Sequence, residues 1–145
     1  MVVESSVVNK LRDARDRGIA YVLQQQRADG AIGNPEADGL APYYKALWAL
    51  AAGGRTEEGN RLATWIAHNV LTEEGDFAGA LRGDGHNYSY PYPNGWITCG
   101  AQKLGRFDIT HRAMEFLPRL QHPETGGFRM QRDKEDAPQV IQPLG

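Results

Sequence analysis

The residues best suited to acid–base chemistry lie in one long stretch rich in glycine, proline and tyrosine, residues 78–95. Asp84 and His86 stand two positions apart there, and such a pair can transfer protons if it faces a cavity. A solvated polar turn is the other interpretation of the same two residues. We take Asp84 and His86 as the candidate catalytic residues.

Aromatic side chains are concentrated in this stretch and in two apolar segments on either side of it. In an extended chain Tyr88, Tyr90 and Tyr92 would lie on one side. Aromatic rings can hold an apolar ligand, and each can stabilise a cation by about 0.5–2 kcal/mol. The alternative is that the rings fill the protein core. The candidate ligand-binding residues are Tyr43, Tyr44, Trp48, Tyr88, Tyr90, Tyr92, Trp96 and Cys99.

Metal ligands are sparse in this sequence. It has one cysteine and four histidines, and no two histidines have the spacing of a shared metal site. We therefore expect no metal and no cofactor. Lys45 is the only charge in an apolar segment, and two interpretations stay open. It either extends to solvent from a helix start, or it places a cation in a cavity that binds an acidic ligand.

Composition limits the classes of protein to which the chain can belong. The length of 145 residues suits one domain, and the net charge of −2 without a basic cluster argues against nucleic-acid binding. Charges begin too early for a signal peptide, and no apolar run approaches the ~20 residues of a membrane span. Cys99 has no internal disulfide partner, which fits a reducing compartment. These features predict a cytoplasmic protein.

Hydrophobic periodicity predicts helices throughout, and we expect an all-α chain. Amphipathic segments begin near residues 7, 56 and 109, while residues 41–52 and 96–104 are apolar on nearly all sides. This alternation predicts two layers, with the apolar helices inside. Pro118 should bend or end the last helix. The expected inner face of the first helix consists of Val7, Leu11, Ala14, Gly18 and Tyr21.

The three amphipathic segments share an ending. Each has an aromatic–aliphatic pair, a polar helix end, an acidic residue, a glycine and then a bulky apolar residue. The glycines are Gly30, Gly75 and Gly126, which are 45 and 51 residues apart. A period of this size indicates stacked helical hairpins.

The first of these endings, RGIAYVLQQQRADGAIG (Arg17 to Gly33), resembles the QW motif of prenyltransferases and squalene cyclases. The resemblance covers roughly residues 7–130, although Ile32 stands where the family usually has tryptophan. It implies an α/α toroid of about two and a half hairpins over residues 1–130, followed by an irregular tail over residues 131–145. By analogy, Gln26 should bond free backbone groups at the ends of neighbouring helices, and Gly30 should allow a turn with positive φ.

The resemblance also implies a function. Related toroids enclose hydrophobic ligands, so we expect a hydrophobic small molecule, isoprenoid or polyketide-like, and cyclisation or isomerisation in natural-product biosynthesis. The D-x-D-D acid run of squalene–hopene cyclases and the zinc ligands of prenyltransferases are absent. A non-catalytic helical-repeat binding or assembly module, or a truncated cyclase fragment, therefore stays an alternative.

The number of hairpins falls short of a closed ring, because family toroids have around five to seven. An incomplete ring would leave apolar flanks open to water, and large exposed apolar patches are rare on monomers. We therefore expect a homo-oligomer, or a missing partner segment that completes the barrel.

Overall fold

The computed structural model describes residues 5–40, 42–77, 90–130 and 139–140. Over these residues the chain is mostly helical, so the all-α prediction is confirmed there. The two strands are only two residues long and pair with each other, Phe128 opposite Val140. The elements in order are α1 (Ser5–Gln24), α2 (Pro35–Asp38), α3 (Ala46–Ala52), α4 (Thr56–Asn69), α5 (Pro91–Lys103), α6 (Phe107–Phe116), the 3₁₀ helix η1 (Leu117–Leu120), β1 (Phe128–Arg129) and β2 (Gln139–Val140).

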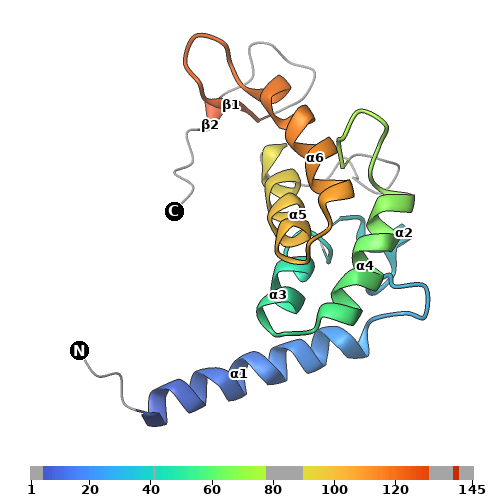
Figure 1. Ribbon diagram of the computed structural model, residues 1–145, viewed down its shortest axis with the longest axis vertical. Coiled ribbons are helices and arrows are strands. Elements are labelled where there is room, and N and C mark those ends of the chain that lie inside the picture. The colour runs from blue at the N-terminus through green and yellow to red at the C-terminus, as the bar shows by residue number, and fades with distance from the viewer. Residues whose placement is uncertain (1–4, 41, 78–89, 131–138, 141–145) are drawn as a thin grey trace.

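The two apolar helices pack against each other, as the sequence predicts. α3 contacts α5, while α4 packs on α3 and α6 packs on α5 (Figure 1). α1 contacts α3 and crosses the end of this group, and its N-terminal half extends past the other helices. The closure of these hairpins into a ring stays a prediction.

Large aliphatic side chains from both layers form one core. Leu47 and Leu50 of α3, Ile66 of α4 and Ile97 of α5 are all completely buried. Each such side chain contributes about 1.5–3 kcal/mol when it leaves water. Gly100 allows α5 to approach α3 closely, because a Cβ at that position would overlap Leu47 and the backbone of Trp48. The core is therefore built where the expected inner helices meet.

Two helix boundaries differ from the sequence prediction. α3 begins at Ala46 rather than at residue 41, and the short helix α2 precedes it. α5 begins at Pro91 rather than at Trp96. The prolines of the PYP run favoured a loop, yet the first helical turn tolerates proline because its N–H groups have no partner inside the helix. The interpretation of Tyr90 and Tyr92 as part of an extended run was therefore wrong.

The expected inner face of α1 was also wrong. Val7, Leu11 and Tyr21 are 45%, 65% and 67% exposed. The helix instead buries Ile19, which is 5% exposed and packs against Gly53. The predicted apolar stripe exists on α1, but among the described residues no neighbouring helix covers it.

The three repeated endings fold into three similar turns. We call them turn 1 (residues 26–32), turn 2 (residues 71–77) and turn 3 (residues 121–128). In each turn the first and last residues form an antiparallel bridge. The glycine of each turn has positive φ, at 97°, 91° and 72° for Gly30, Gly75 and Gly126. The sequence repeat therefore corresponds to a repeat in the structure.

Turn 1 holds the next outer helix through a side-chain amide. Gln26 Nε2 donates to the Glu58 carbonyl at 2.9 Å and to the Gly30 carbonyl at 3.2 Å. Arg61 Nη2 donates back to Gln26 Oε1 at 3.3 Å. Gln26 thus bonds the backbone of a neighbouring helix, as predicted, but the carbonyl lies in the first turn of α4 rather than at a helix C-terminus.

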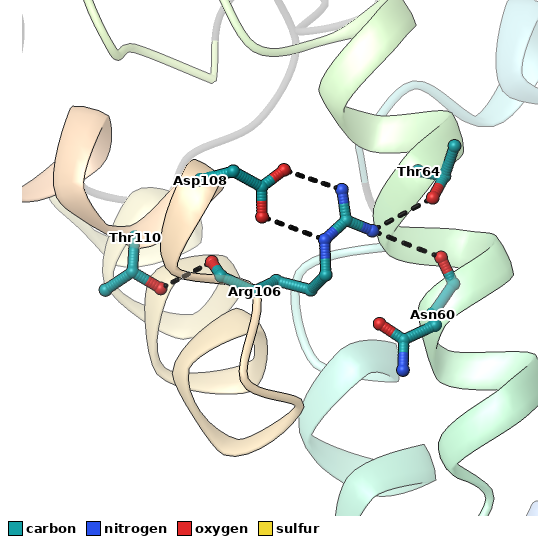
Figure 2. Close-up of polar contacts among 5 residues, drawn as sticks. All are labelled: Asn60, Thr64, Arg106, Asp108 and Thr110. Carbon is teal, nitrogen blue, oxygen red and sulfur yellow. Dashed lines mark hydrogen bonds and ion pairs between the residues drawn. The ribbon is translucent and has the colours of Figure 1, made fainter.

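Arg106 joins the outer helices α4 and α6 (Figure 2). It stands just before α6 and donates two hydrogen bonds to the Asp108 carboxylate, at 2.9 and 2.7 Å. Its Nη1 donates to Thr64 Oγ1 at 2.9 Å and to the Asn60 carbonyl at 3.3 Å, both on α4. The bonded guanidinium lowers the pKa of Asp108. One side chain thereby fixes the start of α6 against α4. As expected from Pro118, α6 ends early and continues as η1.

Candidate functional site

Four aromatic rings form a continuous row along α3, the turn that precedes it, and α5. Tyr92 and Trp96 lie four residues apart and share one side of α5, while Trp48 is on α3 and Tyr44 is in the turn before it. The ring centroids are 5.6 Å apart for Tyr44–Tyr92, 6.3 Å for Tyr92–Trp96 and 5.8 Å for Trp96–Trp48. We call this row the aromatic surface.

Two lysine ammonium groups lie over the aromatic surface. Lys45 Nζ is 5.3, 5.5 and 5.4 Å from the centroids of Tyr44, Tyr92 and Trp96. Lys103 Nζ is 4.3 Å from the Trp48 centroid. Exposed cation–π contacts of this kind contribute about 0.5–1 kcal/mol. The sequence marked Lys45 as unusual but gave no indication of Lys103. The arrangement shows that the ring faces are accessible to a cation.

The Lys45 ammonium also changes the chemistry of one ring. Its hydrogen bond to the Tyr92 phenol lowers the pKa of that group. A positive charge beside a phenol favours the phenolate. The Tyr92 hydroxyl is therefore a stronger hydrogen-bond donor than that of an isolated tyrosine.

The aromatic surface is half-buried rather than enclosed. All four of its rings are of intermediate exposure, and they lie outside the set of fully buried core residues. A shallow depression of about 360 Å³ lies elsewhere, between turn 1 and α4. The residues that line it are Asp29, Glu57, Asn60, Arg61 and Thr64. The four rings of the aromatic surface are thus partly exposed, and none of them lines this depression.

The structure separates Tyr43 from the other aromatic candidates. Its side chain is completely buried, stacks on Trp65 with centroids 5.0 Å apart, and donates a hydrogen bond to the Ile32 carbonyl at 2.7 Å. Burial raises the pKa of Tyr43 to about 12. Tyr43 therefore has no exposed surface for a ligand. Cys99 is exposed on α5. Asp84, His86 and Tyr88 lie outside the described residues.

A polar cluster of Asp76, Tyr90 and Asn94 joins turn 2 to α5, and the sequence analysis missed it. Asp76 is completely buried; the Tyr90 hydroxyl donates to one carboxylate oxygen, and Asn94 Nδ2 donates to the other at 2.7 Å. The equivalent positions in turns 1 and 3 hold Ala31 and Gly127. That departure from the repeat is the signal that could have identified the cluster. Tyr90, a candidate ligand-binding residue, thus contacts turn 2 through its hydroxyl.

Comparisons of the chain with protein-family models, curated proteins and solved structures found no match. Within the described part of the chain, no group of three or more His, Cys, Asp or Glu side chains is placed to hold a metal ion. None of the helices described is both long and apolar enough to cross a membrane. The resemblance to toroid enzymes therefore depends on the motif and the repeat.

Proposed function

We propose that this chain is an α/α toroid domain of the terpene-cyclase type that binds a hydrophobic, isoprenoid or polyketide-like small molecule on its aromatic surface. The row of four half-buried rings supports this most directly. Apolar side chains of this size leave water favourably, so a row that stays partly exposed is available to an apolar ligand.

The charges around the rings restrict the ligand further. Lys45 and Lys103 supply positive charge over the rings of this surface. A ligand with a long apolar body and an anionic or strongly polar end would contact both features. An isoprenoid diphosphate has this chemistry, and the aromatic faces could also stabilise a positive charge that develops along the chain.

Ligand binding can be tested by tryptophan fluorescence, because the chain has three tryptophans and two belong to the aromatic surface. In Trp65→Phe, the remaining tryptophans report on that surface alone. Farnesyl diphosphate should change the emission of this variant saturably. In the matched variant Trp48→Phe/Trp96→Phe, the remaining Trp65 should not respond. An equal response in both variants, or none in Trp65→Phe, would refute binding at this surface.

Catalysis forms the second part of the proposal. Asp84 and His86 are the proton donors assigned to a cyclisation or isomerisation, because either side chain can exchange protons near neutral pH when its surroundings tune it. Asp84→Asn and His86→Asn should each abolish product from farnesyl diphosphate, measured by gas chromatography, and leave the far-UV circular dichroism unchanged. Unchanged turnover in both variants would remove the assignment, whereas the fluorescence result would still decide binding.

A non-catalytic assembly module is the second candidate function. The observation that favours it is the uncovered state of turn 3, which is described below. If the wild-type chain binds farnesyl diphosphate but forms no product, and if it self-associates, this second function is the better one.

A further inference from the structure

Each of the first two turns holds an outer helix at the same backbone position. A Cβ on Gly30 would overlap the carbonyl of Arg61 in α4, and a Cβ on Gly75 would overlap the carbonyl of Arg112 in α6. The arginines also bond back: Arg61 donates to Gln26 Oε1, and Arg112 Nη2 donates to the Thr72 carbonyl at 2.6 Å. The same junction therefore occurs twice: the glycine of a turn packs on the carbonyl of an arginine in the next outer helix, and the arginine side chain donates a hydrogen bond back to the turn.

Turn 3 has the parts of this junction, but none of the described helices lies on it. Gln121 Nε2 donates to the Gly126 carbonyl at 2.8 Å, which matches the bond of Gln26 to Gly30. A Cβ on Gly126 would meet only Gln121 Nε2, at 3.6 Å. In the described part of the chain, the side of turn 3 that corresponds to the helix-binding side of turns 1 and 2 is thus uncovered.

α1 has the complementary parts, and none of the three turns described lies on them. Arg17 precedes Tyr21 by four residues, as Arg61 precedes Trp65 and Arg112 precedes Phe116. Within the parts of the chain that the structure describes, no other element comes within 4 Å of a Cβ placed on Gly18, the residue that follows Arg17.

The exposure of Tyr21 agrees with the absence of a described turn on this side of α1. Tyr21 is 67% exposed, whereas its counterpart Phe116 is 2% exposed and its counterpart Trp65 stacks on Tyr43. The first helix of the series therefore lacks the covering that the second and third helices have.

We propose that turn 3 of one copy of this chain binds α1 of a second copy. By equivalence with turn 1, Gly126 packs against the Arg17 carbonyl, and the Gln121 amide donates to the carbonyl of Ala14, the counterpart of Glu58. The Arg17 guanidinium donates to Gln121 Oε1 or to the His122 carbonyl.

Charge supports a second copy as the occupant. The exposed segment of residues 10–17 on α1 carries four basic and two acidic side chains, and Glu124 is exposed on turn 3. Turn 1 likewise presents Asp29 beside Arg61, the arginine that it holds, since both residues line the same depression. The interface pairs two different surfaces, so association is head-to-tail and leaves one free turn and one free α1 on an open dimer.

Sedimentation velocity over a range of concentrations tests the proposal on the full chain. The wild type should self-associate, and Gly126→Ala should weaken association at least tenfold because a Cβ would meet the docked helix. Gly105→Ala is the matched control, since Gly105 has nearly the same positive φ, 73°, and open space around it. A wild type that stays monomeric, or equal effects of the two substitutions, would overturn the proposal; the first result would leave another protein's helix as the occupant.

A mixing experiment tests the head-to-tail geometry. Arg17→Glu should abolish association by placing a carboxylate against acceptors, while Arg12→Glu makes the same charge change on the far side of α1 and should not. Gly126→Ala keeps an intact α1 and Arg17→Glu keeps an intact turn 3. An equimolar mixture should therefore form dimers and nothing larger. A mixture that stays monomeric, although the wild type associates, would show that the interface is built differently.

Discussion

At the scale of single residues, the amide of Gln26 explains how a turn recognises a helix that comes more than thirty residues later in the chain. Gln26 donates to Glu58, accepts from Arg61 and closes its own turn at Gly30. Gln24 precedes it in the same run but is exposed. One glutamine of the three therefore carries the contact between the outer helices.

Replacing Gln26 should weaken folding, and replacing Gln24 should not. Gln26→Leu removes the donor to two carbonyls, so we expect a loss of about 1–3 kcal/mol in the free energy of unfolding. Gln24→Leu changes an exposed side chain and should alter this free energy by less than about 0.5 kcal/mol. Urea denaturation of both variants measures the difference; equal losses would contradict the contact.

Tyr43 makes stability sensitive to alkaline pH. Its pKa in the folded chain, about 12, lies above the ordinary value of 10.0. The stabilisation that depends on the protonated phenol is therefore complete below pH 10 and is lost as pH rises through about 12. At about pH 8, Tyr43→Phe should cost about 1–3 kcal/mol, because the buried Ile32 carbonyl loses its donor.

The test is the pH dependence of that difference. Urea denaturation at about pH 8 and about pH 11 should show a smaller gap between wild type and Tyr43→Phe at the higher pH. Tyr21→Phe, at an exposed tyrosine, controls for general effects of alkali. A gap that stays constant would mean that the buried phenol does not titrate as described.

The sequence identified residues whose role follows from a turn or a motif. It missed residues whose role depends on a side chain that only the packing of the helices brings near. Gly30 follows from turn chemistry, and Gln26 from its place in a motif. Asp76 and Lys103 do not, because the Tyr90 hydroxyl and the Trp48 ring that they meet are brought near only by the packing of α5. A buried carboxylate in one of three repeats could be noticed in the sequence, but its partners could not.

At the scale of elements, the same limit explains the helix boundaries. The periodic patterns predicted α4 and α6 well, because each of these helices buries a stripe against an inner helix. The start of α5 was missed because Pro91 and Pro93 are as common in loops as in a first helical turn. The pattern on α1 is amphipathic, but which side is buried depends on neighbours that the pattern does not reveal.

The close approach of turn 2 to α6 gives a prediction for that pair of elements. Gly75→Ala and Gly105→Ala both place a side chain at positive φ, which costs about 1–2 kcal/mol. Gly75→Ala should cost about 1–3 kcal/mol more, since its Cβ would overlap the Arg112 carbonyl and force the turn away from α6.

Thermal unfolding compares the two variants directly. Gly75→Ala should lower Tm further than Gly105→Ala, by roughly 2–4 °C for each additional kcal/mol in a chain of this size. Equal melting temperatures would show that turn 2 does not press on the backbone of α6.

At the scale of the whole molecule, stability should be uneven along the chain. Residues 9–18 of α1 are exposed, and a helical segment of that length is marginal in water without a partner. Ile97 and Ala101 of α5 are completely buried beside α3. The amides of residues 9–18 should therefore exchange with deuterium much faster than those of residues 97–101.

Hydrogen exchange measured at two protein concentrations connects this unevenness to association. Binding of α1 to turn 3 of a second copy should slow exchange in residues 9–18 at high concentration and leave residues 97–101 unchanged. Exchange that is slow in both regions at low concentration would mean that α1 is stable without a partner.

The arrangement of the hairpins could be predicted further than the site. Three similar endings predicted three similar turns, and the apolar segments predicted which helices meet in the core. The candidate ligand site was predicted only as a set of aromatic residues. Their separation into a core residue, Tyr43, and a surface row follows from the turns before α3, which the sequence pattern placed inside a helix.

The carboxylate of Asp76 makes turn 2 chemically different from turns 1 and 3, which have Ala31 and Gly127 at the equivalent position. Hairpins in repeat proteins are often interchangeable, because each contacts only its neighbours. If the sequence of turn 1 replaced that of turn 2, alanine would stand beside the Tyr90 hydroxyl and the Asn94 amide, and both would lose the acceptor they now share. A hairpin that is duplicated or exchanged would therefore fold stably only if the segment transferred includes both turn 2 and the beginning of α5.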